Sequence, residues 1–109
     1  MRQLALWGFI AASLVSCRTL TPWEDIAVQL PPEDLLSLNG RTVHVKDSGD
    51  GPAVLLLHGF AASNYSWREV MPALTSEFRV IAPDLNGFGY TERPDDLKDY
   101  TPDGQLDLI

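Results

Sequence analysis

The second half of the chain alternates short apolar runs with polar, turn-forming stretches. Residues 53–57 read Ala-Val-Leu-Leu-Leu, and residues 78–83 read Phe-Arg-Val-Ile-Ala-Pro. A short apolar run bounded by turn residues is typical of a strand that is covered on both faces. We therefore predict two buried strands, as in a parallel sheet under helices.

The segment before the first apolar run predicts a β-hairpin over residues 35–47. Its centre is Asn39-Gly40, the dipeptide that best tolerates the positive φ angles of a type I′ turn. By alternation, Val43 and Val45 face the core. His44 then lies on the outward face, where we expect a surface residue.

Apolar residues recur at helical spacing between the two predicted strands: Trp67, Val70, Met71, Leu74 and Phe78. This stripe predicts a helix that turns Trp67 to the core. Ser66 and Glu69 fit a capping box at its start, and Pro72 predicts a kink or a restart. Thr101 before Pro102 predicts a further helix start.

The element order predicts the opening of an α/β domain, which we expect to be incomplete at Ile109. The composition of the 109 residues, 45% hydrophobic and 21% charged, is that of a globular protein. The formal charge of −7 repels phosphate backbones, so nucleic acid is not an expected partner.

The first residues predict a signal peptide over residues 1–16. One basic residue, Arg2, precedes an apolar run that is too short to cross a bilayer, which takes roughly 20 residues. The ending Leu-Val-Ser-Cys resembles the lipobox of bacterial lipoproteins. This resemblance implies that Cys17 becomes the first mature residue and carries lipid that anchors the protein to a membrane of the cell envelope.

Two alternatives stay open for this N-terminus, an uncleaved anchor and an ordinary signal that contains a Cys, and secretion is the alternative localisation. We interpret residues 17–34, which contain Pro22, Pro31 and Pro32, as a tether. Residues 35–109 then form the N-terminal portion of the folded domain. Because Cys17 is the one cysteine, no intrachain disulfide is expected.

Three spaced features carry a second resemblance. His58-Gly59 follows the first predicted strand, Trp67 lies nine residues after His58, and Asp-x-x-Gly-x-Gly follows the second strand from Asp84. Together they resemble the N-terminal part of an α/β-hydrolase-fold enzyme. The nearest branch contains epoxide hydrolases, haloperoxidase-like esterases and lactonases, and haloalkane dehalogenases.

This resemblance implies that the turn after the first strand binds negative charge. The backbone N–H of Phe60 would donate to the oxyanion, Gly59 would let substrate approach, and His58 would shape the turn rather than act as the base. The Phe60 ring would line the pocket. Dehalogenases of this type usually have Asn at this position, so Phe60 favours esters, lactones or epoxides.

The sequence contains no G-x-S-x-G and no G-x-D-x-G, so Ser63 is interpreted as a loop or capping residue. The resemblance implies that the nucleophile, acid and base follow Ile109, and that none of the catalytic residues lies in this chain. We expect a cofactor-independent hydrolase for small-molecule esters, lactones or epoxides if the chain continues, and no activity from these residues alone. A non-catalytic hydrolase-like binding protein and an inactive truncated product are the alternatives.

Two other kinds of site are disfavoured. His44 and His58 have no cluster of Cys or acidic residues beside them, so no metal site is expected. Glu92 occupies the third glycine position that a dinucleotide-binding loop starting at Gly87 would need. We instead predict a tight turn at the rim of the sheet, held by Asp84.

Overall fold

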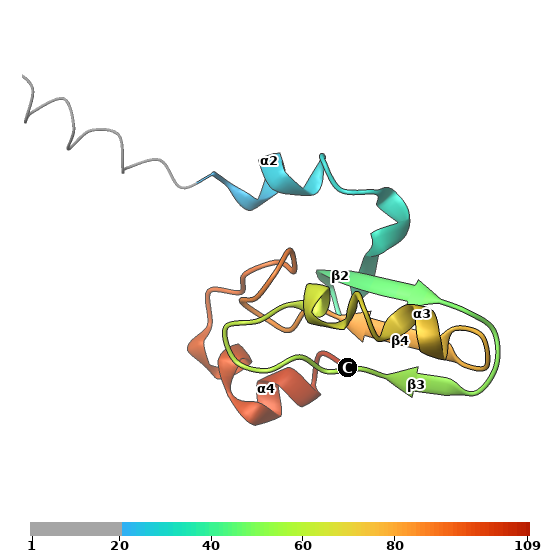
Figure 1. The fold of residues 1–109 in the computed structure, drawn as a ribbon. Coiled ribbons are helices and arrows are strands. Elements are labelled where there is room, and N and C mark those ends of the chain that lie inside the picture. The colour runs from blue at the N-terminus through green and yellow to red at the C-terminus, as the bar shows by residue number, and fades with distance from the viewer. Residues whose placement is uncertain (1–20) are drawn as a thin grey trace, which may run out of the picture.

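The computed structural model describes residues 21–109, which form one mixed four-stranded sheet with short helices (Figure 1). The order of the strands in the sheet is β1-β2-β4-β3. Their bounds are Leu35–Leu38 for β1, Arg41–Ser48 for β2, Ala53–Leu55 for β3 and Arg79–Pro83 for β4. The predictions of a signal peptide over residues 1–16 and of lipid on Cys17 lie outside the described residues.

The predicted hairpin is present. Strands β1 and β2 pair antiparallel with Leu38 opposite Arg41, so Asn39 and Gly40 form a two-residue turn. Their φ angles are 50° and 79°, which are the positive values that a type I′ turn requires. The sequence pattern was therefore sufficient to place this turn.

The two faces of β2 are both covered. Val43 and Val45 are buried as predicted and pack in a core cluster with Leu108 of the C-terminal segment. The prediction for His44 was wrong, because this residue is only 4% exposed. The loop that follows β4 lies over the second face of β2, where it covers the imidazole.

Strands β3 and β4 pair in parallel, as predicted, with Val54 opposite Val80. Strand β3 is shorter than expected, although Leu56 N–H continues the ladder to Ile81 O at 2.9 Å. Leu55 and Leu57 are 45% and 43% exposed, so the expected covering on both faces is missing within residues 21–109. In that part of the chain β3 pairs only with β4 and leaves its other edge open.

The connection from β3 to β4 contains two short helices instead of one. The 3₁₀ helix η2 spans Asn64–Trp67, and α3 spans Met71–Leu74 and lies against β4 (Figure 1). The predicted capping box at Ser66 was wrong, because Ser63 caps η2 by accepting a hydrogen bond from Tyr65 N–H. Pro72 lies in the first turn of α3, which agrees with the predicted restart.

The C-terminal segment contains the 3₁₀ helix η3, Leu97–Tyr100, and α4, Pro102–Leu106. Thr101 caps α4, since its Oγ1 accepts from Gly104 N–H at 3.2 Å, as the Thr-Pro pair predicted. This cap places Leu108 against the core.

The segment interpreted as a tether contains α2, Trp23–Ala27, and the 3₁₀ helix η1, Pro32–Asp34. It contacts the domain, because Trp23 Nε1–H donates to Tyr90 O at 3.1 Å and Asp34 forms an ion pair with Lys46. Among residues 21–109, no helix has the length and apolar character needed to span a membrane.

Candidate functional site

The turn that leaves β3 presents a backbone donor. Gly59 O accepts from Ala62 N–H at 3.2 Å, and Ala61 has a φ of 56°. A non-glycine residue in the left-handed region costs about 1–3 kcal/mol and tends to occur at functional sites. Within the described part of the chain, no acceptor pairs with Phe60 N–H. The turn therefore offers one backbone N–H to a ligand.

His58 is almost fully buried beside this turn and bonds to backbone groups through both ring nitrogens. Its Nε2 accepts from Leu85 N–H at 3.0 Å, and its Nδ1–H donates to Gly59 O at 2.8 Å. Because Nε2 accepts, the proton is assigned to Nδ1 of a neutral ring. Both nitrogens are thus engaged in joining the turn to the residue that follows Asp84.

Aromatic rings surround the turn. The Phe88 ring packs edge-on against His58 and against Phe60, with centroid distances of 5.7 Å in both cases. The Phe60 side chain is 92% exposed, so its ring forms part of the outer surface of the turn. Sequence reasoning missed Phe88, although its place between Gly87 and Gly89 marks a tight loop after β4.

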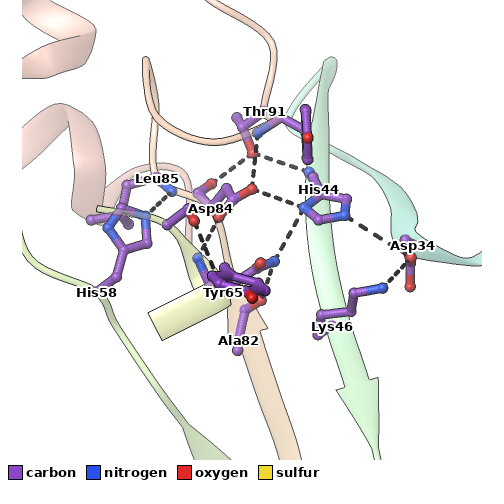
Figure 2. A network of polar contacts seen from close by, with 12 residues as sticks. Asp34, His44, Lys46, His58, Tyr65, Ala82, Asp84, Leu85 and Thr91 are labelled. Atoms are coloured by element: carbon purple, nitrogen blue, oxygen red, sulfur yellow. Dashed lines mark hydrogen bonds and ion pairs between the residues drawn. The ribbon is translucent and has the colours of Figure 1, made fainter. Parts of the chain in front are cut away.

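Asp84 is fully buried at the end of β4 and accepts three hydrogen bonds (Figure 2). Its Oδ1 accepts from Asn64 N–H at 2.6 Å, and its Oδ2 accepts from Tyr90 N–H at 2.9 Å and from His44 Nδ1–H at 2.8 Å. Burial alone would raise the pKa of Asp84, but the hydrogen bonds from His44 and from the two N–H groups hold that pKa below its ordinary value of 3.8. The carboxylate is therefore charged in the fold, and it holds the loop as predicted.

His44 lies at the centre of this network rather than on the surface. Its Nε2 is 4.0 Å from Asp34 Oδ2, and its ring packs edge-on against Tyr90 at 5.4 Å. Thr91 Oγ1 accepts from His44 N–H at 3.0 Å and donates to Asp84 O at 2.7 Å. Figure 2 shows that η1, β2 and the loop after β4 all contribute to this cluster.

Ser63 and Trp67, which the sequence analysis also considered, lie near the turn after β3 in the sequence. Ser63 Oγ is engaged in capping η2, which fits its interpretation as a capping residue. Trp67 is half-buried. Residues 21–109 contain no cluster of three or more His, Cys, Asp or Glu side chains that could hold a metal ion.

Comparisons with known proteins bear on this site. A family model described as alpha/beta hydrolase fold matches residues 52–109. An epoxide hydrolase of Caballeronia sordidicola is 46% identical over 68 residues, which cover 62% of this chain and 21% of that protein. Epoxide hydrolase 1 of Siraitia grosvenorii is 49% identical over 67 residues, which cover 61% of this chain and 21% of that protein.

Solved structures of hydrolases also match about two thirds of this chain. A mutant epoxide hydrolase of Vigna radiata superposes with a TM-score of 0.64 at 43% identity, over 68% of this chain and 24% of that one. A meta-cleavage product hydrolase from Pseudomonas fluorescens IP01 superposes with a TM-score of 0.64 at 40% identity, over 69% of this chain and 28% of that one. The chain thus spans between 21% and 28% of the length of these relatives.

Proposed function

The chain belongs to the alpha/beta hydrolase fold family, and on that premise we propose that it supplies the oxyanion-binding turn of a hydrolase for small-molecule epoxides, esters or lactones. The observation that carries this proposal is the Phe60 N–H, which no described residue accepts, on a turn held by buried hydrogen bonds. The names of the relatives favour epoxides. The nucleophile, the acid and the base would come from sequence beyond Ile109.

The chemistry requires a donor at the position of Phe60. Attack of a Ser nucleophile on a substrate carbonyl, or of water on the ester that an Asp nucleophile forms, places negative charge on a carbonyl oxygen. The Phe60 N–H and the N–H of the residue after the nucleophile would share that charge. Loss of one such donor costs about 3 kcal/mol of transition-state stabilisation. The mechanism needs no cofactor.

The two substrate classes would use this donor at different steps. With a Ser nucleophile and an ester or lactone, the oxyanion forms in the first chemical step. With a carboxylate nucleophile and an epoxide, attack at ring carbon opens the ring, the alkoxide takes a proton from a neighbouring acid, and an alkyl ester of the enzyme forms. Negative charge on a carbonyl oxygen then appears only when water attacks this ester.

The test compares Phe60→Pro with Phe60→Ala in the full-length protein. Proline removes the N–H, whereas alanine keeps it and removes only the ring. We expect kcat to fall by about 10²-fold or more for Phe60→Pro relative to Phe60→Ala. Circular dichroism and thermal melting check that both variants fold. Equal kcat values in two folded variants would contradict the proposal.

Single-turnover kinetics identify the substrate class. If the substrate is an epoxide, Phe60→Pro still opens the ring in a burst, and the alkyl ester accumulates as a covalent adduct visible by mass spectrometry. If the substrate is an ester or lactone, the burst itself is slowed and no adduct accumulates.

We also propose that lipid on Cys17 anchors the protein to a membrane of the bacterial cell envelope, with secretion as the alternative. The support is the Leu-Val-Ser-Cys ending of the first apolar run. Labelling of cells with a palmitate analogue should mark the wild-type protein and leave Cys17→Ser unlabelled. Equal label on both proteins, or label on neither, would contradict the anchor.

A further inference from the structure

The turn that carries Phe60 is held on both sides by consecutive residues at the end of β4. On the N-terminal side, Leu85 N–H donates to His58 Nε2 at 3.0 Å. On the C-terminal side, Asn64 N–H donates to Asp84 Oδ1 at 2.6 Å. We call these two contacts the flanking hydrogen bonds. Because one ends on the backbone N–H of Leu85 and the other on the side chain of the adjacent Asp84, they tie both sides of the turn to two neighbouring residues.

The acceptor on the C-terminal side is itself held rigidly. Asp84 Oδ2 accepts from His44 Nδ1–H and from Tyr90 N–H, at 2.8 Å and 2.9 Å. Asn64 is 6% exposed, and its Nδ2–H donates to Ala82 O at 3.2 Å. Charge-assisted hydrogen bonds in a buried setting are among the stronger polar contacts in proteins. Asp84 therefore cannot shift without breaking contacts to three other segments.

The turn between the flanking hydrogen bonds has little of its own to hold its shape. It contains Gly59, an exposed Phe60 and a left-handed Ala61, and its internal contacts are the hydrogen bonds that Gly59 O accepts from Ala62 N–H and from His58 Nδ1–H. A left-handed non-glycine residue persists only where the surrounding structure imposes it. The flanking hydrogen bonds connect this segment to the buried end of β4 on both sides.

We propose that Asp84, supported by His44 and acting through Asn64, is a positioning residue that sets the direction of the Phe60 N–H. This inference rests on the proposed oxyanion role of Phe60, and it names Asp84 as the residue that orients the Phe60 N–H. An oxyanion donor acts only at a fixed distance from the developing charge, and a displacement of about 1 Å can lower the rate on the order of 10²-fold.

A matched pair of variants isolates the Asn64 hydrogen bond. Asn64→Ala removes the side chain but keeps the N–H, whereas Asn64→Pro removes both. Proline suits this position, because Asn64 is the first residue of η2 and the preceding Ser63 is extended, with φ −153° and ψ 175°. The difference between the two variants is therefore the hydrogen bond to Asp84.

In the full-length enzyme we expect kcat for Asn64→Pro to be lower than for Asn64→Ala by about tenfold or more, with KM changed less than about twofold. The ¹⁵N order parameter of Phe60 should fall from about 0.85 to about 0.6 in Asn64→Pro alone. Equal kcat values and equal order parameters in the pair would overturn the inference. Asp47→Asn breaks an exposed ion pair with Arg79, far from the flanking hydrogen bonds in the sequence. As the control, it should leave both kcat and the Phe60 order parameter unchanged.

A double-mutant cycle separates this inference from the proposed function. In a Phe60→Pro background there is no N–H to aim, so the two Asn64 variants should give the same kcat. A tenfold difference that persists in this background means a general structural role and overturns the inference. If Phe60→Pro alone matches Phe60→Ala, the oxyanion role fails instead, whereas the order parameter still reports whether Asp84 orders the turn.

Discussion

His44 Nδ1–H donates a 2.8 Å hydrogen bond to Asp84 Oδ2, and both residues are buried, at 4% and 0% exposure. His44 lies on β2 and Asp84 directly follows the neighbouring strand β4, where the loop after β4 begins. Their pairing shows how the fold buries a carboxylate next to the turn at Phe60 for which we propose an oxyanion-binding role.

Loss of the imidazole should destabilise the fold strongly. His44→Ala removes the hydrogen bond from Nδ1–H to the buried Asp84 carboxylate, and a buried charged acceptor that loses such a donor costs about 1–3 kcal/mol or more. Lys46→Ala on the same strand removes an exposed partner of Asp34 and should cost no more than about 1 kcal/mol. Urea unfolding of the two variants measures the difference. Similar midpoints would show that the His44–Asp84 pair contributes little.

The stability of the fold should decrease in acid because of Asp84. Burial acts to raise its pKa, but the hydrogen bonds from His44, Asn64 and Tyr90 lower the pKa in the folded chain below 3.8. The stability from this group is therefore fully present above the unfolded pKa of 3.8, and it is lost as the pH falls through the lower folded pKa.

Asp84→Asn removes this titration, so its unfolding free energy should change less than that of the wild type between about pH 6 and pH 2. Urea unfolding at several pH values in this range makes the comparison. Parallel pH curves for the two proteins would mean that other carboxylates cause the acid sensitivity.

Gly89 should tolerate no side chain. A Cβ there would lie 2.0 Å from Asp84 Oδ2, and the φ of 52° is unfavourable for other residues. Gly89→Ala should therefore cost more than about 3 kcal/mol, through both strain and displacement of the carboxylate. Gly40→Ala is the matched control, because its φ is also positive while its Cβ would meet open space. Its cost should stay near about 1 kcal/mol. Equal losses would refute the steric argument.

The open edge of β3 should drive self-association of residues 21–109 in isolation. Exposed Leu55 and Leu57 flank an unpaired edge, and the apolar hollow of about 330 Å³ beside it is lined by Leu55, Ile81 and Leu108 among others. Leu57→Lys should raise the concentration at which sedimentation detects oligomers. Val28→Lys changes another exposed apolar residue, away from this edge, and is the control. A sharp monomeric melt of the unmodified polypeptide would contradict the prediction.

Local signals in the sequence were sufficient to predict several structural elements. Asn39-Gly40 predicted the hairpin turn because its conformational preference is intrinsic to the two residues. Thr101-Pro102 predicted the start of α4 for the same reason. The apolar run before His58 predicted the strand that leads into the candidate turn. Asp84 was correctly expected to hold a loop, although its partners were unknown.

Two of the errors, at His44 and Ser66, involve contacts with residues far along the chain. His44 was placed outside because alternation alone cannot show that the loop after β4 covers the second face of β2. Ser66 was favoured as a cap because the bond from Asn64 N–H to Asp84, 20 residues away, is invisible in a local pattern. These contacts come from tertiary structure, which overrides local preference.

The hydrogen bonds of Asp84 also set the order in which the chain can fold. They join residues that are 40 and 20 positions apart, whereas the β1–β2 hairpin needs only neighbours. Contacts between distant positions carry a larger loop-closure cost and form later than local ones. During synthesis, the hairpin and the strand before His58 leave the ribosome first, and we expect the turn at Phe60 to gain its shape only after residues 84–91 have emerged. On this argument the nascent protein presents residues 58–64 as an unformed loop until then.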